Sequence, residues 1–138
     1  MEEKVVVVSG YFNPVHKGHI SMFKEAKKFG NKLIVIINSD KQVEMKGSRK
    51  FMDEDERKYI VESFGCVDQA IISIDDDKTQ CKTLAMLKPH IFANGGDRRN
   101  EDDLPEAAVC KEQNIEMIFN IGGDKVQSSS WLLSKKEE

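Results

Sequence analysis

The chain has 138 residues, 39% of them hydrophobic and 33% charged, and its formal net charge is −3. This length fits one domain with its own core, and the charge excludes the strongly positive field of a typical nucleic-acid-binding protein. The sequence contains no run of about 18 apolar residues and no leader-like segment, so we expect a cytoplasmic protein without a membrane span.

Five short apolar runs are predicted to form strands. The first three are rich in valine and isoleucine and are continuous rather than alternating, which is typical of strands buried on both faces of a parallel sheet. The runs are Val5–Ser9, Leu33–Asn38, Ala70–Ile74, His90–Ala93 and Glu116–Ile121.

A helical pattern follows each strand, and we expect Gly30 to cap the first helix. The patterns cover 18–29, 53–64, 79–87, 104–113 and 128–134. Strands that alternate with helices predict βαβ units. The expected fold is therefore a single α/β domain over residues 1–138, with a five-stranded parallel sheet and helices on both faces.

Ligands bind parallel α/β sheets at the carboxyl ends of the strands. Three loops with glycine and polar side chains reach that edge, at 9–19, 94–103 and 121–130. The first loop contains neither G-x-G-x-x-G nor G-x-x-x-x-G-K-[ST], which counts against a dinucleotide-binding dehydrogenase and against a P-loop enzyme.

Two histidines in the first loop are candidate phosphate ligands. His16 and His19 lie three residues apart, so a helical turn puts both imidazoles on one side. Gly18 leaves the backbone open to a ligand, and a helix N-terminus at this point favours anions. From spacing alone, a capping residue and a core residue explain the pair equally well.

No metal site is predicted. His90 is the only other histidine and no cysteine lies near the pair in sequence, so a zinc site is disfavoured. The cysteines, Cys66, Cys81 and Cys110, are widely spaced and odd in number, so we expect ordinary reduced thiols.

The segment Tyr11–His19 resembles the HxGH signature of the cytidylyltransferase-like nucleotidylyltransferases. Later segments resemble, in order, further motifs of glycerol-3-phosphate cytidylyltransferases and heptose-1-phosphate adenylyltransferases. These segments are Arg49–Arg57 with Cys66–Asp68, Leu87–Phe92 with Asn94–Asp97, and Ser128–Ser130. The resemblance runs the length of the chain and implies a Rossmann-like fold.

The resemblance also implies a reaction without a covalent enzyme intermediate. The phosphate of an acceptor attacks the α-phosphorus of a nucleoside triphosphate, which Mg²⁺ accompanies, and pyrophosphate leaves. Positioning and charge stabilisation would supply the catalysis. Relatives are often homodimers, so we expect a homodimer that has no nucleic-acid or membrane partner.

Site residues are carried over from the resemblance one by one. The implied catalytic residues are His16, His19, Lys46 and Ser129. The implied nucleotide-binding residues are Gly10, Tyr11, Phe12, Asn13, His16, Gly18, His19, Asn94, Gly95, Asp97, Gln127, Ser128, Ser129 and Ser130. The implied substrate-binding residues are Lys46, Arg49, Lys50 and Arg57.

Plainer interpretations of these residues stay open. The basic residues of the 46–50 segment also fit a solvated loop, and the serines also fit a helix cap. Arg57 also fits an ion pair with Glu54 or Asp53 at helical spacing.

The mid-chain motifs and the short length favour transfer of CMP from CTP to a small phosphomonoester. The rival is adenylyl transfer from ATP to a sugar phosphate or mononucleotide, which Gly95-Gly96-Asp97 suggests. A third hypothesis is a nucleotide-binding module without turnover. Two departures leave the base and the acceptor open: Gly65 stands where cytidylyltransferases often have arginine, and Asn13-Pro14 resembles nicotinate-mononucleotide adenylyltransferases.

Overall fold

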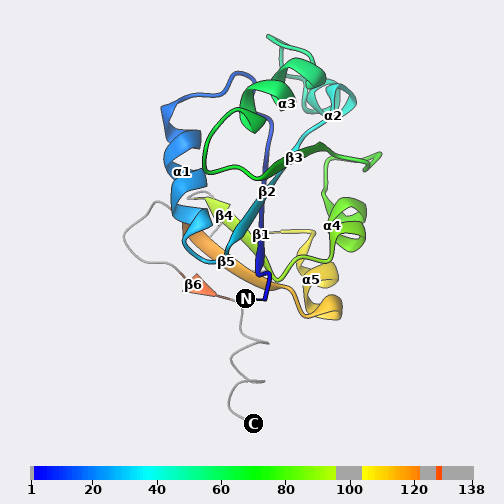
Figure 1. The fold of residues 1–138 in the computed structure, drawn as a ribbon. Helices are drawn as coiled ribbons and strands as arrows, with labels where there is room; N and C mark the ends of the chain where they lie inside the picture. The colour runs from blue at the N-terminus through cyan, green and yellow to red at the C-terminus, as the bar shows by residue number, and fades with distance from the viewer. Residues whose placement is uncertain (1, 96–103, 122–126, 129–138) are drawn as a thin grey trace.

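The computed structural model describes residues 2–95, 104–121 and 127–128. One sheet with the strand order β3-β2-β1-β4-β5-β6 forms its centre (Figure 1). The strands from β1 to β5 are parallel, and the short β6 pairs antiparallel with β5. The bounds are β1 Val5–Gly10, β2 Lys32–Ile37, β3 Gln69–Ile72, β4 Ile91–Gly95, β5 Glu116–Ile121 and β6 Gln127–Ser128. The five predicted parallel strands are confirmed, with small shifts at their ends.

Helices cover both faces of the sheet, as predicted. Figure 1 shows α1 (Lys17–Lys27) on one side of the sheet, with α4 (Cys81–Leu87) and α5 (Ala107–Gln113) on the other. The helix α3 (Glu54–Glu62) shares its apolar cluster with α1. A second cluster joins the opposite sheet face to α4 and α5.

The strand β1 shows why its sequence is continuously apolar. Val6 and Val8 belong to the cluster under α1, whereas Val7 belongs to the cluster on the other face. All three side chains are fully buried. Because successive residues of a strand point to opposite faces, a strand covered on both sides needs apolar residues at every position.

A helix that the sequence pattern did not predict is present after β2. This helix is α2, Asp40–Lys46. The Ser39 side chain caps it by accepting a hydrogen bond from the backbone of Gln42, and the Gln42 side chain accepts one from the backbone of Ser39. Gly47 ends the helix in the left-handed conformation, with a φ of 80°. The S-x-x-Q pattern and the following glycine are a standard start and stop signal.

Gly30 does not cap α1, so that prediction is wrong. The C-cap is Lys28, which has ordinary right-handed geometry. Gly30 instead lies where two backbones approach closely, because a Cβ added there would stand 2.4 Å from the carbonyl oxygen of Lys4. The glycine is therefore required by packing and not by the end of the helix.

The chain after β5 departs from the expected helix at 128–134. Gln127 and Ser128 form β6, which pairs with Phe119 and Ile118 of β5. The expected helix start at Ser128 is therefore wrong, and residues 129–134 lie outside the described residues.

The three cysteines are free thiols. Cys110 is fully buried, and this burial raises the pKa of its thiol to about 12, which makes the thiol unreactive. Within the described part of the chain, no helix is both long and apolar enough to cross a bilayer.

Candidate active site

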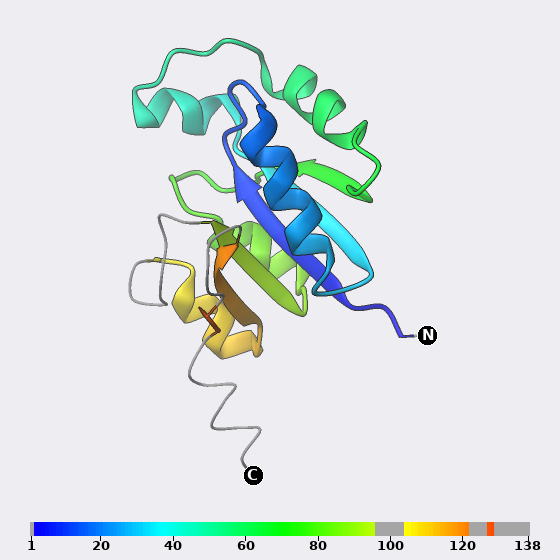
Figure 2. The ribbon, with the colours of Figure 1, turned by 90° about the vertical axis from the view of Figure 1, so that its left-hand side faces the viewer.

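The candidate site is a cleft of about 480 Å³ at the carboxyl edge of the sheet. The strand order reverses between β1 and β4, and open α/β sheets bind ligands in the crevice at such a point. Figure 2 shows α1 beginning at the same edge where β1 and β4 end. We call this the inner cleft. Its described lining residues are Ser9, Gly10, Tyr11, His16, Gly18, His19, Met22, Asn38, Lys78, Gln80, Ala93, Asn94, Gly95, Glu106 and Ile121.

The two histidines form the N-terminal cap of α1 and also line this cleft. His16 is the N-cap, and its Nδ1 accepts a hydrogen bond from the backbone of Gly18 at 3.1 Å. The Nδ1 of His19 accepts from the backbone of His16 at 3.1 Å. The two rings stack with their centroids 3.8 Å apart. Capping, which was the plainer alternative from spacing, and lining of the cleft therefore occur together.

These hydrogen bonds fix where the imidazole protons lie. Because each Nδ1 accepts a hydrogen bond, a neutral ring carries its proton on Nε2. Burial, together with the charge of the neighbouring His16, lowers the pKa of His19 from 6.5 to about 4. His19 is therefore neutral at physiological pH, and its Nε2–H is a hydrogen-bond donor suited to a phosphate oxygen.

Lowering the pH from about 6.5 to about 4 should reduce the free energy of unfolding through His19. In this range the unfolded chain binds a proton at this imidazole and the folded chain does not, so acid favours unfolding. Since His19 is only half-buried, we expect a modest effect. Urea denaturation at neutral and at acidic pH would measure it. His19→Gln keeps a capping group and should flatten this part of the profile; equal pH dependence in both proteins would contradict the assignment.

Phe12 packs against the ring of His19. Its ring is buried and meets the His19 ring edge-on at 4.9 Å and the Phe23 ring at 5.3 Å. The Phe12 backbone has a φ of 51°, an uncommon conformation for a residue with a side chain. In this structure Phe12 therefore positions a histidine, and its predicted contact with the nucleotide remains a prediction.

A second hollow of about 500 Å³ lies beside the histidines, and we call it the outer basin. Lys46 places its Nζ 4.1 Å from the centre of the Tyr11 ring, a cation–π contact. The Arg49 guanidinium lies 5.9 Å from the centre of the Phe51 ring. The described lining residues are Tyr11, Phe12, Asn13, Pro14, His16, His19, Lys46, Ser48, Arg49 and Phe51.

Asn13 ties the basic segment to the signature loop. Its Nδ2 donates to the carbonyl oxygen of Arg49 at 2.7 Å, and its Oδ1 accepts from the backbone of Phe51 at 2.9 Å. These two bonds hold the segment beside the histidines. The predicted role of Asn13 was nucleotide binding, and the structure gives its side chain this structural role.

Arg57 is fully buried and does not line either hollow. Its guanidinium donates to the carbonyl oxygens of Tyr11 and Asn38, each at 2.7 Å. It pairs with Asp40 at 2.9 Å, and not with Glu54 or Asp53 as the alternative interpretation had it. The structure therefore corrects its predicted contact with substrate: Arg57 holds the loops that carry the site.

Other predicted residues divide into three groups. Asn94 and Gly95 line the inner cleft at the end of β4. Lys50 pairs with Asp40 at 3.6 Å and lines neither hollow. Gln127 and Ser128 are described only as strand, and Asp97, Ser129 and Ser130 lie outside the described residues.

Five polar residues of the inner cleft are not among the predicted site residues: Ser9, Asn38, Lys78, Gln80 and Glu106. Asn38 follows β2, and Lys78 and Gln80 follow β3, so the rule that placed three loops at the carboxyl edge applies to these loops as well. The run of polar residues after Ile74 was the available signal.

Within the described residues, no group of three histidine, cysteine, aspartate or glutamate side chains could hold a metal ion. Glu106 is the one carboxylate among the described residues of the inner cleft. The site that the structure describes is thus a set of hydrogen-bond donors and cations arranged around a histidine pair.

The sequence model of the family described as Cytidylyltransferase-like matches residues 7–136. The chain belongs to the cytidylyltransferase-like family. The FAD synthase of Aciduliprofundum boonei is 33% identical over 113 residues, which are 81% of this chain and 73% of that protein. This membership confirms the family resemblance of the motifs.

Two further comparisons agree with this assignment. The bifunctional protein HldE of Koribacter versatilis is 38% identical over 98 residues, 70% of this chain but only 20% of that protein. The chain thus spans about a fifth of the HldE proteins it matches. The crystal structure of a lipopolysaccharide core biosynthesis protein of Thermoplasma volcanium aligns with this chain. The alignment covers 90% of this chain and 100% of that protein's chain. Its TM-score of 0.74 at 27% identity confirms the Rossmann-like α/β fold of this cytidylyltransferase-like chain.

Proposed function

We propose that the chain transfers an adenylyl group from ATP to a small phosphorylated acceptor and releases pyrophosphate. The stacked His16 and His19 pair at the start of α1, beside the switch point of the sheet, is the observation that carries the transfer chemistry. The choice of ATP rests on the relatives, because the HldE proteins and the FAD synthase favour adenylyl transfer. It reverses the preference for CTP that the mid-chain motifs suggested.

In the proposed reaction, an oxygen of the acceptor phosphate attacks the α-phosphorus of ATP. The new bond joins that oxygen to the α-phosphorus, and the bond to the β-phosphate oxygen breaks in line with it. Negative charge moves onto the departing pyrophosphate. The Nε2–H groups of His16 and His19 and the positive end of the α1 dipole are suited to stabilise that charge.

No side chain has to act as a nucleophile in this scheme. The chain supplies orientation, because it holds two phosphorylated substrates against one histidine pair. Lys46 and Arg49, in the outer basin, supply positive charge beside those histidines. The fixed N-cap geometry means that the donors need little reorganisation when charge develops.

Mg²⁺ is proposed to arrive with the triphosphate. Mg²⁺ usually keeps several waters and is held by substrate phosphates with one or two carboxylates. The described residues, which contain no three-ligand cluster, fit an ion of this kind. When bound, it would neutralise part of the phosphate charge.

A substrate panel tests the proposal. The protein is incubated with Mg²⁺, each of the four nucleoside triphosphates, and a set of sugar phosphates, glycerol 3-phosphate and mononucleotides. Pyrophosphate release is then measured. Release with ATP alone is the expected result. Binding of a triphosphate without release from any pair would favour a binding module and overturn the proposal.

CTP remains the second candidate nucleotide. The mid-chain segment Arg49–Arg57 resembles that of glycerol-3-phosphate cytidylyltransferases, and this is the specific observation that favours it. In the same panel, pyrophosphate release with CTP and not with ATP would select it. The reaction type and the roles of the histidines would then stand unchanged.

A further inference from the structure

The inner cleft has two halves, on either side of the end of β1. The half beside β4 and β5 is lined by Asn94, Gly95 and Ile121. The half beside β2 and β3 is lined by Asn38 and by residues that follow β3. If the nucleoside lies along β4, as the resemblance implies for Asn94 and Gly95, the second half is left for the acceptor.

Lys78 supplies the positive charge in this second half. Among the described residues of the inner cleft it is the only lysine or arginine, and it is exposed. The nearby Lys41 and Lys82 both pair with Asp76, at 3.7 Å and 3.3 Å. Within the described part of the chain Lys78 has no such ion pair, so its ammonium group is available to an anion.

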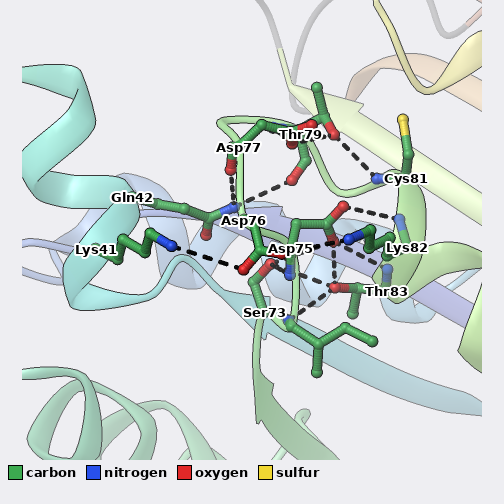
Figure 3. A network of polar contacts seen from close by, with 11 residues as sticks. Lys41, Gln42, Ser73, Asp75, Asp76, Asp77, Thr79, Cys81, Lys82 and Thr83 are labelled. Atoms are coloured by element: carbon green, nitrogen blue, oxygen red, sulfur yellow. Dashed lines mark hydrogen bonds and ion pairs between the residues drawn. The ribbon is translucent and has the colours of Figure 1, made fainter.

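The buried Gln42 holds the backbone of Asp77 and Thr79 (Figure 3), which are the two neighbours of Lys78 in the sequence. The Nε2 of Gln42 donates to the carbonyl oxygens of Asp77 and Thr79, at 2.7 Å and 3.1 Å. Its Oε1 accepts from the backbone of Ser39 at 3.0 Å. Both ends of this amide are therefore used, and the capping box of α2 is joined to the segment that carries Lys78.

The same segment is fixed from the side of α4. Asp75 is buried and accepts from the backbones of Lys82 and Thr83, at 2.8 Å and 3.0 Å, and so caps that helix (Figure 3). Asp77 accepts from the backbone of Thr79 at 2.9 Å. A segment ordered in this way needs little further ordering when a ligand binds, which favours affinity.

We propose that Lys78 binds the phosphate group of the acceptor and that Gln42 is a positioning residue that holds it in the β2–β3 half of the cleft. The proposal rests on the proposed function, because it assigns one half of the same cleft to the second substrate. A lysine is a compact point charge with rotatable donors, which suits the dianion of a phosphomonoester. From this half an acceptor oxygen can approach a triphosphate held by His16 and His19.

Inorganic phosphate is the first probe, and its binding is followed by amide chemical shifts in the full chain. Lys78→Met should weaken phosphate binding in the cleft about tenfold to a hundredfold, the range for loss of a charge-assisted hydrogen bond. Lys82→Met is the matched control, since it removes an exposed lysine nearby that pairs outside the cleft. Equal phosphate affinity in Lys78→Met and the wild-type protein would overturn the proposal.

Gln42→Glu tests the positioning role. Glutamate still accepts the Ser39 hydrogen bond of the capping box, but it donates to neither carbonyl oxygen. With saturating triphosphate we expect a higher KM for the acceptor, and an unchanged KM for the triphosphate. A rise in both constants, or in neither, would contradict a specific role in holding Lys78.

Failure of the proposed function is recognised separately. If the wild-type protein releases no pyrophosphate with any pair of substrates, adenylyl transfer fails, and the phosphate titration of Lys78→Met still decides the assignment of Lys78. If the wild-type protein is active, Lys78→Met should raise the acceptor KM by a similar factor. An active Lys78→Met variant with a wild-type acceptor KM would leave the reaction standing and reject Lys78 as its acceptor residue.

Discussion

Replacing His16 with asparagine or His19 with glutamine should lower kcat by about 10²–10³ while the protein stays folded. Each histidine has two functions that these variants separate. The Nδ1 atoms accept the backbone hydrogen bonds that cap α1. Asparagine at the N-cap and glutamine three residues later are both favoured capping groups. The variants therefore keep the helix start and lose only the Nε2–H donors.

Alanine at either position would be a less informative change, because it removes the cap together with the donor. His90→Ala is the control. His90 accepts a hydrogen bond from the backbone of Val5, at the opposite edge of the sheet from the cleft. We expect it to keep wild-type kcat. Single-turnover measurements with saturating substrates compare the three variants, and wild-type kcat in both cap-preserving variants would refute the role of the pair.

The sheet could be predicted from sequence because both faces of its strands are buried, so that nearly every strand position is apolar. Val6, Val7 and Val8 alternate between two apolar clusters, so the run has to be apolar throughout. Such a run is distinct from an amphipathic helix in both composition and length. The order of the strands was not predictable in the same way, since it depends on contacts between segments far apart in the chain.

The roles of polar residues were harder to predict than the elements. Asn13 and Arg57 are motif residues, and their types suit contact with a nucleotide. The structure shows that both bind the backbone of other loops, and that Asn13 also lines the outer basin whereas Arg57 lines neither hollow. Nothing local distinguishes an arginine that binds phosphate from one that binds carbonyl oxygens, because both present the same donors. Which of the two an arginine binds depends on where the partner loops lie, and their position is a property of the fold.

Lys78 and Gln42 are residues whose place in or beside the cleft could not be predicted from the sequence. Neither residue belongs to the family motifs that the sequence shows, and they lie 36 positions apart. Gln42 contacts the backbone on both sides of Lys78 because β2 and β3 are neighbours in the sheet, which brings the segments that follow these strands to one edge. The signature loop could be found from its resemblance to the HxGH motif, whereas this part of the cleft depends on the strand order.

Arg57→Met should destabilise the protein by about 3–5 kcal/mol, because the fully buried guanidinium donates to three backbone carbonyl oxygens and each lost bond of this kind costs about 1–3 kcal/mol. The change removes the donor to the carbonyl oxygens of Tyr11, Asn38 and Met52 and, among the described residues, leaves Asp40 paired only with the exposed Lys50. A domain of this kind has only about 5–15 kcal/mol of total stability, so the loss is large. Urea denaturation monitored by circular dichroism measures it.

Lys58→Met is the matched control, because Lys58 is the next residue of the same helix and pairs on the surface with Glu62. Its loss should cost less than about 1 kcal/mol. Arg57→Lys should recover little, since one ammonium group cannot reach acceptors that the guanidinium contacts through three nitrogens. Because Tyr11 and Asn38 line the cleft, the surviving folded fraction of Arg57→Met should also bind triphosphate less tightly. A stability equal to that of Lys58→Met would mean that Arg57 is not the residue that holds these loops together.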